Sequence, residues 1–255
     1  MFKTDIIVEV RTTSNRLPGK AIKKIINRPV IELMIERLKR ISNVQDIIIA
    51  TTINTDDDVI EKISNKNKVK CFRGSENDVL GRVLLAANKY NTDIIVEITG
   101  DNPLIDPHIS ELIIEFFIKN NLKYDYVSND VGCYDNKISF NLALGLNVKI
   151  FKTSLLKKVS ELTINPVDRE HVVNYILQNS DKYKIHNYEV EKVYQRPDLR
   201  FTLDYQEDFE LIRYVYENLY LKKNDFNAKD IIGFLDDNPK IKQLNQKCIQ
   251  NQYTY

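Results

Sequence analysis

The regular alternation of short apolar runs with amphipathic segments is the feature that most limits how this chain can fold. The apolar runs are almost pure Ile, Val and Ala, and the segments between them repeat apolar residues at three- and four-residue spacing. Strands of this kind are buried on both faces, so the pattern predicts an α/β fold with a mainly parallel central sheet and helices on both faces. The expected strands of the first half are 5–10, 46–51, 69–72 and 93–99, and the expected helices are 29–41, 56–63, 76–90 and 107–120.

The pattern changes after residue 121. A strand at 124–128 precedes a polar stretch, 129–145, which we interpret as a flap or subunit-joining excursion beside the sheet. The polar end, 240–255, is expected to be a frayed terminal helix. With no internal repeat and no long linker, the 255 residues predict a single domain, 1–255. Between these parts we expect strands at 142–150, 184–190 and 200–203, and helices at 152–162, 168–178 and from 204 to 220.

Charge and cysteine content exclude several function classes. Lys and Arg total 37 against 36 Asp and Glu, a net charge of +1. Such a balance offers no field for gripping nucleic acid or an anionic membrane, so neither is expected as a partner. The 3 Cys and 3 His lack metal-ligand spacing, which argues against a zinc site or disulfide framework and suits a reducing cytoplasm. We expect no signal peptide, and no apolar run approaches the ~20 residues needed to span a bilayer.

The loop after the first strand concentrates groups that bind anions. It carries Arg11, Ser14, Arg16 and Lys20, with a Pro-Gly pair just before the lysine. Glycine lets backbone amides turn toward a ligand, and Arg and Lys bind phosphate oxygens as a planar fork and a point charge. In open α/β sheets nucleotides bind at this position. The alternative, a solvated basic loop, is equally compatible with this segment by itself.

Two aspartates follow expected strands and are candidates for a metal site. Asp101 lies in a Gly-Asp-Asn-Pro turn at the carboxyl end of strand 93–99, and Asp204 ends the strand 200–203. Proteins hold Mg²⁺ with one or two carboxylates plus substrate phosphates. The structural alternatives are an Asx turn for Asp101 and the N-cap of the following helix for Asp204, in a capping-box pattern.

Three further groups carry weaker signals. In the segment 73–82, Ser75 is a candidate helix cap, Asp78 suits a first helical turn, and Gly81 inside a helix indicates close approach of a neighbour or ligand. Glu170 and His171 are either a solvated first turn or a substrate contact. The acidic run 56–58 is interpreted as a complement to a helix dipole rather than as a metal motif.

Several of these segments together resemble the CMP-sugar cytidylyltransferase superfamily, and most closely its branch named for spore coat polysaccharide biosynthesis. The matching blocks occur in family order between about residues 5 and 217, and their coincidence is far more specific than any one of them. They are Arg-x-x-Ser-x-Arg-Leu-Pro-Gly-Lys at 11–20, Phe-Arg-Gly-Ser at 72–75, Asp-Val-Leu-Gly-Arg at 78–82, Ile-Thr-Gly-Asp-Asn-Pro-Leu-Ile at 98–105, Asp-Tyr-Val-Ser-Asn at 125–129, Arg-Glu-His-Val at 169–172, and Arg-Phe-Thr-Leu-Asp at 200–204 with Glu-Asp at 207–208.

The resemblance implies a nucleotide-diphospho-sugar transferase (Rossmann-like) fold, CTP as donor, Mg²⁺ as cofactor, and a homodimer joined near 129–145. It assigns catalysis to Arg16, Lys20, Asp101 and Asp204, the last two as metal ligands. The nucleotide site is expected at Val8, Val10, Arg11, Ser14, Arg16, Lys20, Arg73, Asp78, Arg82, Thr99 and Gly100. The acceptor site is expected at Asn102, Asn129, Asn147, Lys149, Glu170 and His171.

Departures from the family pattern concern the acceptor. Glu9 stands where the family usually has Gln, and Val10 where it has a small residue. The segment 145–149, Gly-Leu-Asn-Val-Lys, replaces a common Gly-Leu-Asp-Val-Glu, so a neutral residue, Asn147, and a basic residue, Lys149, stand where two acids are usual. This change suggests an acceptor with extra negative charge, such as a phosphate.

The predicted reaction is transfer of CMP from CTP to a sugar phosphate or an acidic sugar, with release of pyrophosphate, in the synthesis of a surface polysaccharide or glycan precursor. It needs positioning and charge neutralisation rather than a protein nucleophile. Two alternatives remain. A metal-dependent glycosyltransferase shares the sheet and the acids but expects an Asp-x-Asp motif, and a non-catalytic nucleotide-binding protein would lack the loop lysine or the aspartates.

Overall fold

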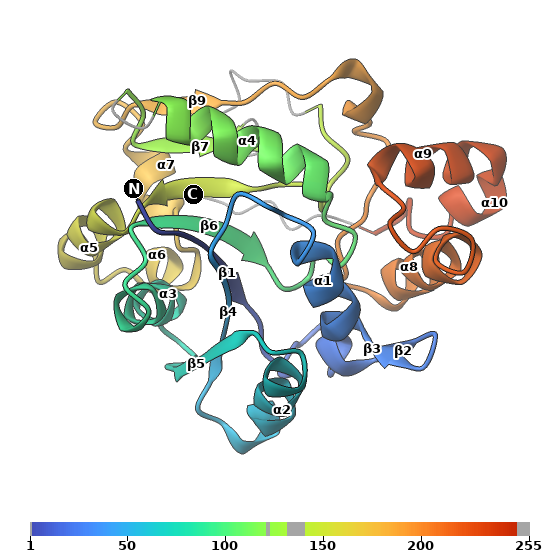
Figure 1. Cartoon of the computed structure of the whole chain (residues 1–255), viewed down its shortest axis with the longest axis horizontal. Helices are drawn as coiled ribbons and strands as arrows, with labels where there is room; N and C mark the ends of the chain where they lie inside the picture. The colour runs from blue at the N-terminus through green and yellow to red at the C-terminus, as the bar shows by residue number, and fades with distance from the viewer. Residues whose placement is uncertain (1, 121–122, 132–140, 249–255) are drawn as a thin grey trace.

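A computed structural model describes residues 2–120, 123–131 and 141–248. Its centre is a sheet in which seven described strands follow the order β5-β4-β1-β6-β8-β7-β9 (Figure 1). The chain order and spatial order differ because helices connect the strands across the faces of the sheet. The strands are β1 Thr4–Glu9, β4 Asp46–Thr52, β5 Lys70–Gly74, β6 Ile94–Thr99, β7 Tyr126–Ser128, β8 Lys149–Lys152 and β9 Ile185–Asn187.

The predicted α/β fold with a mainly parallel sheet is confirmed. β1 pairs in parallel with both β4 and β6, and β4 pairs in parallel with β5. Among the described strands of this sheet only β8 runs against its neighbours, antiparallel to β6 and to β7, whereas β9 is parallel to β7. Because β1 lies in the middle and is fully covered, its Ile and Val side chains are buried on both faces.

Helices cover both faces of the sheet. On one face α1 (Val30–Leu38), α2 (Asp58–Lys66) and α4 (Pro107–Asn120) pack against side chains that include Ile6 and Val8. On the other face α3 (Val79–Lys89) and α5 (Thr153–Leu162) pack against a set that includes Ile7 and Ile95. Consecutive residues of β1 therefore belong to opposite cores, as the two-residue period of a strand requires.

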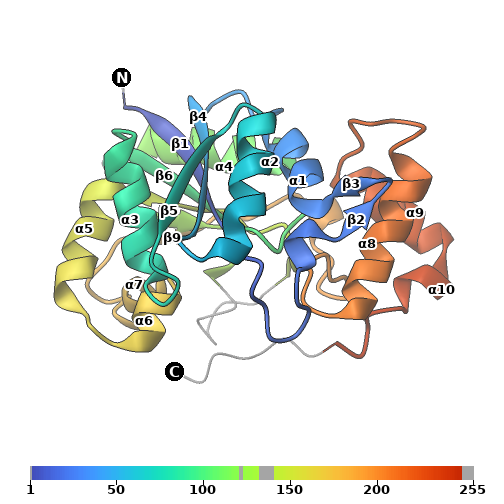
Figure 2. The ribbon, with the colours of Figure 1, turned by 90° about the horizontal axis from the view of Figure 1, so that it is seen from below.

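A group of C-terminal helices lies beside α1 (Figure 2). It contains α8 (Gln206–Leu219), α9 (Ala228–Asp237) and α10 (Pro239–Lys242), next to the small β2 (Lys24–Ile25) and β3 (Arg28–Pro29) hairpin. Buried Arg37 of α1 joins this group to the loop between β6 and α4, since its Nε donates to the Ile105 carbonyl at 2.8 Å and its Nη1 to the Phe226 carbonyl at 3.0 Å. Short 3-10 turns, η1 Lys20–Ile22, η2 Thr55–Asp57 and η4 Lys192–Tyr194, complete the described elements.

Several element predictions in the second half were wrong. Most of 142–150, predicted as a strand, is a loop. The Asn129 side chain bonds the Leu146 carbonyl and the Val148 amide, so these backbone groups are not available to pair with a neighbouring strand. Residues 200–203 form no strand, only an isolated bridge between Leu144 and Arg200. The predicted strand 184–190 shortens to β9, and the helix expected from residue 76 begins at Val79.

The helix predicted at 168–178 is two short helices, α6 (Pro166–Glu170) and α7 (Asn174–Gln178). The break occurs where Asn174 turns back so that its Nδ2 donates to Asp168 Oδ1 at 2.5 Å. Of the predicted terminal helix, only residues 240–248 are described: α10 ends at Lys242, and Asn245 is buried. Residues 132–140 and 249–255 lie outside the described residues, so the excursion, its dimer role and the last part of the tail stay predictions.

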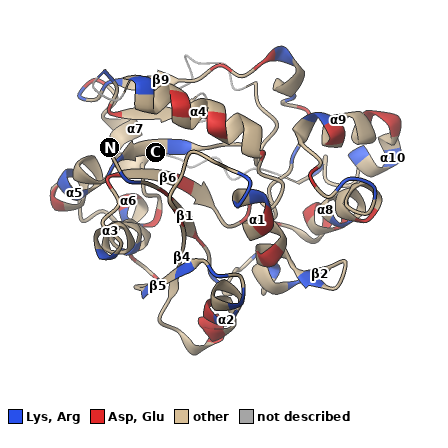
Figure 3. Ribbon diagram, in the orientation of Figure 1, with Lys and Arg blue, Asp and Glu red and all other residues tan. Residues whose placement is uncertain are grey.

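Charged residues of both signs are interspersed over the helices (Figure 3). This arrangement agrees with the balanced composition. None of the described helices is both long enough and apolar enough to cross a membrane.

Candidate active site

A large polar cavity opens at the carboxyl ends of β1 and β6. Its volume is about 1380 Å³, and it is lined by residues from the loop after β1, from the turn after β6, from the α6–α7 connection and from the segment before α8. The carboxyl edge of a parallel sheet is where α/β folds place ligands. The cavity therefore lies where the sequence predicted a nucleotide.

The loop after β1 is held in place by a buried acid. Asp57 Oδ1 accepts from the Thr12 amide at 2.8 Å and from Thr12 Oγ1 at 2.7 Å. The loop closes where the Gly19 amide donates to the Thr12 carbonyl at 3.0 Å. Gly19 has φ +67°, which a glycine adopts without strain. The acidic run 56–58, predicted to complement a helix dipole, thus contains Asp57, which fixes the start of the cationic loop.

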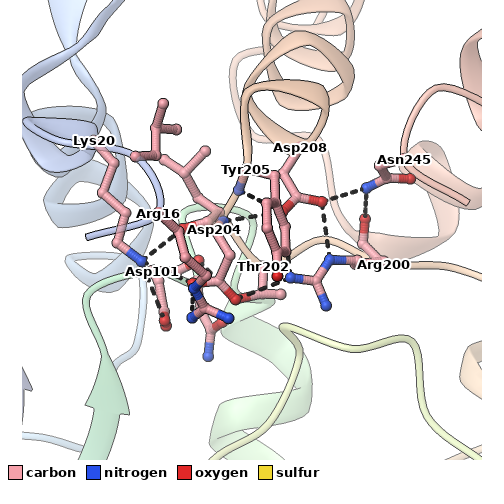
Figure 4. Close-up of polar contacts among 12 residues, drawn as sticks. Arg16, Lys20, Asp101, Arg200, Thr202, Asp204, Tyr205, Asp208 and Asn245 are labelled. Carbon is pink, nitrogen blue, oxygen red and sulfur yellow. Dashed lines mark hydrogen bonds and ion pairs between the residues drawn. The ribbon is translucent and has the colours of Figure 1, made fainter. Parts of the chain in front are cut away.

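Both candidate metal aspartates converge on the end of Lys20 (Figure 4). Lys20 Nζ lies 3.0 Å from Asp204 Oδ1 and 3.6 Å from Asp101 Oδ2, and it also donates to the Leu203 carbonyl at 2.7 Å. Arg16 Nη2 donates to the same Asp204 oxygen at 2.6 Å. Four residues from three distant parts of the chain therefore form one charged cluster.

The position of Asp204 in the sequence suggested that it could cap α8, but in the structure it does not. The N-cap is Tyr205, and Asp208 completes the capping box. Asp208 Oδ2 accepts from the amides of Asp204 and Tyr205, each at 3.0 Å. The Asp204 carboxylate therefore does not cap the helix and instead bonds the charged cluster. Its second oxygen accepts from Arg200 Nη2 at 2.9 Å.

The geometry fits a divalent cation at these acids. Both carboxylates lie within ion-pair distance of a single ammonium, so they point to one cation position. Among the described residues no group of three or more His, Cys, Asp or Glu could hold a metal. Two carboxylates completed by substrate phosphates is the usual arrangement for Mg²⁺.

The Asp101 carboxyl is kept ionised by its neighbours. Burial acts to raise its pKa, but the charge of Lys20 and a hydrogen bond from Thr99 Oγ1 at 2.6 Å outweigh it and hold the pKa below its ordinary value. An ionised carboxylate is the form that binds metal.

A row of charged side chains extends the cavity across the sheet face. Glu9 of β1, Glu97 of β6 and Lys149 of β8 all line it. Lys149 Nζ lies 3.2 Å from Glu97 Oε1, and both side chains are buried. Burial and the charge of Glu97 raise the pKa of Glu9 well above its ordinary value.

This row changes the expectation for the acceptor. The charge of Lys149, which suggested a phosphorylated acceptor, is offset by Glu97. Lys149 is therefore no reason to prefer a phosphate over another acceptor group.

Most predicted site residues line the same cavity. From the nucleotide set these are Val10, Arg11, Ser14, Arg16, Lys20, Arg82, Thr99 and Gly100, together with Asp101 and Asp204. From the acceptor set they are Asn102, Asn147, Lys149, Glu170 and His171. Asn102 Nδ2 bonds Asn147 Oδ1 at 3.1 Å, and burial lowers the pKa of His171.

Four predicted residues do not line the cavity. Val8 is fully buried in the core, because its side chain points to the α1 face of the sheet. Arg73 turns outward, where its Nη1 pairs with Asp58 at 2.6 Å and Glu61 at 3.0 Å. Asn129 holds the 146–148 loop through the two bonds described above.

Asp78, the fourth, joins α3 to α6 beside the cavity. It caps α3 by accepting from the Gly81 amide at 2.8 Å, and it forms an ion pair with Arg169. A Cβ at Gly81 would lie 2.2 Å from the Asp78 carboxylate, so a neighbour does approach closely, as predicted from the helical glycine. Asp78, rather than Ser75, is the helix cap.

Sequence reasoning missed several lining or supporting residues. Glu97 could have been found as an acid inside an otherwise apolar strand, and Arg200 and Asp208 belong to the motifs that were recognised but had no assigned role. Nothing in the local pattern signalled Asn245, because its partners are about forty residues away.

A family model described as cytidylyltransferase matches residues 6–231. The chain belongs to the cytidylyltransferase family. It is therefore a nucleotidyltransferase by family, and the matched region contains both the loop cations and the two aspartates.

Two relatives match nearly the whole of this chain. The cytidylyltransferase is 37% identical over 247 residues to an uncharacterized protein of Methanocaldococcus jannaschii, covering 97% of this chain and 96% of that one. It is 27% identical over 238 residues to the spore coat polysaccharide biosynthesis protein SpsF of Bacillus subtilis, covering 91% and 94%.

Solved structures agree as well. A cytidylyltransferase from Leptospira borgpetersenii superposes with a TM-score of 0.87 at 34% identity and covers 100% of both chains. A CMP:2-keto-3-deoxy-manno-octonic acid synthetase solved with CTP superposes with a TM-score of 0.63 at 16% identity, covering 84% of this chain and 98% of that one. The second similarity is evidence of shared fold alone.

Proposed function

We propose that this cytidylyltransferase transfers CMP from CTP to an acidic sugar or a sugar phosphate, with Mg²⁺ as cofactor and pyrophosphate as the second product. The observation that carries the proposal is the convergence of Arg16 and Lys20 with Asp101 and Asp204 at one point of the cavity. Cations suited to a polyphosphate and acids suited to a divalent cation meet there, as in-line attack on a nucleoside triphosphate requires.

In the proposed reaction an acceptor oxygen attacks the α-phosphorus of CTP. The new oxygen–phosphorus bond forms as the bond from the α-phosphorus to the β-bridging oxygen breaks, and the electron pair leaves with pyrophosphate. A hydroxyl acceptor also releases its proton, whereas a phosphate acceptor attacks as the anion. Arg16 and Lys20 would neutralise the charge that gathers on the leaving group, because fixed cations in a cavity stabilise such charge strongly.

Asp101 and Asp204 would hold Mg²⁺, which would supply further charge neutralisation at the reacting phosphate. Arg11 and Ser14 lie along the same loop and would contact the remaining phosphate oxygens. The acceptor would lie toward Asn102, Asn147 and His171, which line the same cavity. These side chains offer hydrogen-bond donors and acceptors suited to the hydroxyl groups of a sugar.

Among acceptors we favour an acidic sugar, the class named in a 3-deoxy-manno-octulosonate cytidylyltransferase of Trichlorobacter lovleyi that is 34% identical over 139 residues, 53% of this chain. The offset charge of Lys149 removes the reason to prefer a phosphate. Synthesis of a polysaccharide precursor, the role in the name of the Bacillus relative, is the pathway class we propose.

A pyrophosphate-release assay tests this function. Four nucleoside triphosphates are combined in turn with acidic sugars and with sugar phosphates, with and without Mg²⁺. We expect release with CTP, an acidic sugar and Mg²⁺, and loss of release in Asp101→Asn and Asp204→Asn. Sugar transfer without pyrophosphate would instead indicate a glycosyltransferase, and the absence of turnover with every pair would contradict the proposed chemistry.

A further inference from the structure

The C-terminal segment 245–248 forms part of the wall of the active-site cavity. Asn245, Gln246 and Cys248 line it together with Asp204 and Lys20. The segment lies beyond residue 231, where the match to the family model ends. It follows α10 and returns to the start of α8, about forty residues earlier in the chain.

Asn245 is the contact through which this segment reaches the charged cluster (Figure 4). Its side chain is buried, and its Nδ2 donates to the Arg200 carbonyl at 2.9 Å and to Asp208 Oδ1 at 2.8 Å. A single amide thus bridges Arg200 and Asp208, the residue that completes the capping box of α8.

Those two residues hold Asp204 through two hydrogen bonds and are joined to each other by a third. Arg200 Nη2 donates to Asp204 Oδ2 at 2.9 Å, and Arg200 Nε donates to Asp208 Oδ1 at 2.9 Å. Asp208 Oδ2 accepts from the Asp204 amide at 3.0 Å. Arg200 and Asp208 therefore fix both the backbone and the side chain of Asp204, and Asn245 connects them.

We propose that Asn245 is a positioning residue for the reaction, acting through Arg200 and Asp208 to orient the metal-binding carboxylate of Asp204. The C-terminal segment is then a part of the catalytic site rather than an appendage to the family domain. Groups that orient a metal ligand typically change metal affinity or activity by 10- to 100-fold when they are removed. The inference rests on the proposed role of Asp204 as a metal ligand.

The test measures Mn²⁺ affinity of the full chain in the presence of CTP, by titration calorimetry, together with kcat, KM and Tm. Asn245→Ala removes the bridging donor and is expected to weaken Mn²⁺ binding by about 10-fold and to lower kcat more than it raises KM for CTP. Asn245→Asp keeps the shape but places an acceptor against Asp208, so a larger loss is expected. Asn245→Ser retains a shorter donor and is expected to fall between Asn245→Ala and the original chain.

Gln243→Ala is the matched control, because Gln243 lies two residues before the segment and is exposed outside the cavity. It should leave Mn²⁺ affinity and kcat unchanged. Asp204→Asn separates the proposed metal-ligand role of Asp204 from the proposed positioning role of Asn245. If Asp204→Asn leaves Mn²⁺ affinity unchanged, the metal assignment itself fails.

If Asp204→Asn weakens binding but none of the Asn245 variants does, the positioning role alone is overturned. A lower Tm with unchanged Mn²⁺ affinity and kcat, or failure of all three variants to fold, would assign Asn245 a structural role and overturn the inference. Graded loss of Mn²⁺ affinity at little cost in Tm supports it.

Discussion

Lys20 holds the position at which the two aspartates meet. Its ammonium contacts both carboxylates, and Arg16 contacts one of them. A divalent cation that binds there alone must displace these cations, which a polyphosphate would draw toward itself. We therefore expect metal and CTP to bind synergistically, as thermodynamic linkage requires when each favours the same rearrangement.

Replacement of Lys20 separates binding of metal from catalysis. Lys20→Met removes the competing ammonium, so Mn²⁺ should bind more tightly in the absence of nucleotide, whereas kcat should fall on the order of 10²-fold through loss of a transition-state contact. Calorimetry and the pyrophosphate assay measure the two effects. Lys24→Met, at an exposed position on β2, is the control. Unaltered or weaker Mn²⁺ binding in Lys20→Met would contradict the competition.

Glu9 provides a prediction about stability. Burial and the nearby Glu97 raise the pKa of Glu9 well above its ordinary value. The folded protein then binds a proton that the unfolded chain has lost, so stability falls as pH rises through the interval between the two pKa values. Glu9→Gln, which imitates the neutral acid, should raise Tm, and the gain should be larger at pH 8 than at pH 5. Thermal melts at both pH values test this, and an equal gain at both would contradict it.

At the scale of elements, the loop after β1 depends on its attachment to η2. Buried Asp57 binds Thr12 through two hydrogen bonds and also accepts from Thr51 Oγ1 at 3.0 Å, from the Thr52 amide at 3.1 Å and from Thr52 Oγ1 at 2.5 Å. This one side chain therefore joins the start of the loop after β1 to the end of β4. Asp57 therefore positions the loop that carries Arg16 and Lys20. Within the described part of the chain it forms no hydrogen bond with either of these cations.

Asp57→Asn should disturb the loop while leaving its cations in the chain. The amide nitrogen faces donors, and each buried group left unpaired costs about 1–3 kcal/mol. We expect KM for CTP to rise by about 10-fold or more, because the loop must be ordered when CTP binds. The neighbouring exposed acid, in Asp56→Ala, is the control. Steady-state kinetics decide, and an unchanged KM would show that the loop is held by other contacts.

At the scale of the whole molecule, the site lies between the sheet edge and the C-terminal helices. The cavity is lined by residues of β1 and β6 on one side and by residues 197–204 and 245–248 on the other. Net charge is only +1, so the field of the molecule contributes little to binding an anion. A ligand in this cavity contacts both the sheet edge and the C-terminal segments. Ligand binding should therefore stabilise the two parts together.

Thermal melts with ligands test this. At concentrations of about 100 times Kd a ligand adds about 2.7 kcal/mol, which for a chain of this size corresponds to a Tm increase of roughly 5–10 °C. CTP with Mg²⁺ should give such a shift, and the sum of the shifts with CTP and Mg²⁺ separately should be smaller. Asp204→Asn should abolish the excess. Simple additivity in the original chain would contradict a shared site.

Most strands and helices of the first half could be predicted from the sequence, because most of these strands are apolar runs and the helices repeat apolar residues at three- and four-residue spacing. The β2–β3 hairpin between β1 and α1 was not predicted. The second half was predicted less well. Residues 142–148 are apolar but form a loop, since Asn129 satisfies their backbone groups from elsewhere in the chain. A local pattern cannot represent a partner that lies about twenty residues away.

By itself the sequence determined the class of fold, the cationic loop and the two aspartates, because these depend on periodicity and on residues within short segments. Only the tertiary structure decided that Lys20 joins both aspartates, that Glu97 offsets Lys149, that Arg73 faces away, and that Asn245 returns to the site. The physical reason is that charge neutralisation and hydrogen-bond satisfaction are settled between side chains brought together by packing, whatever their separation along the chain.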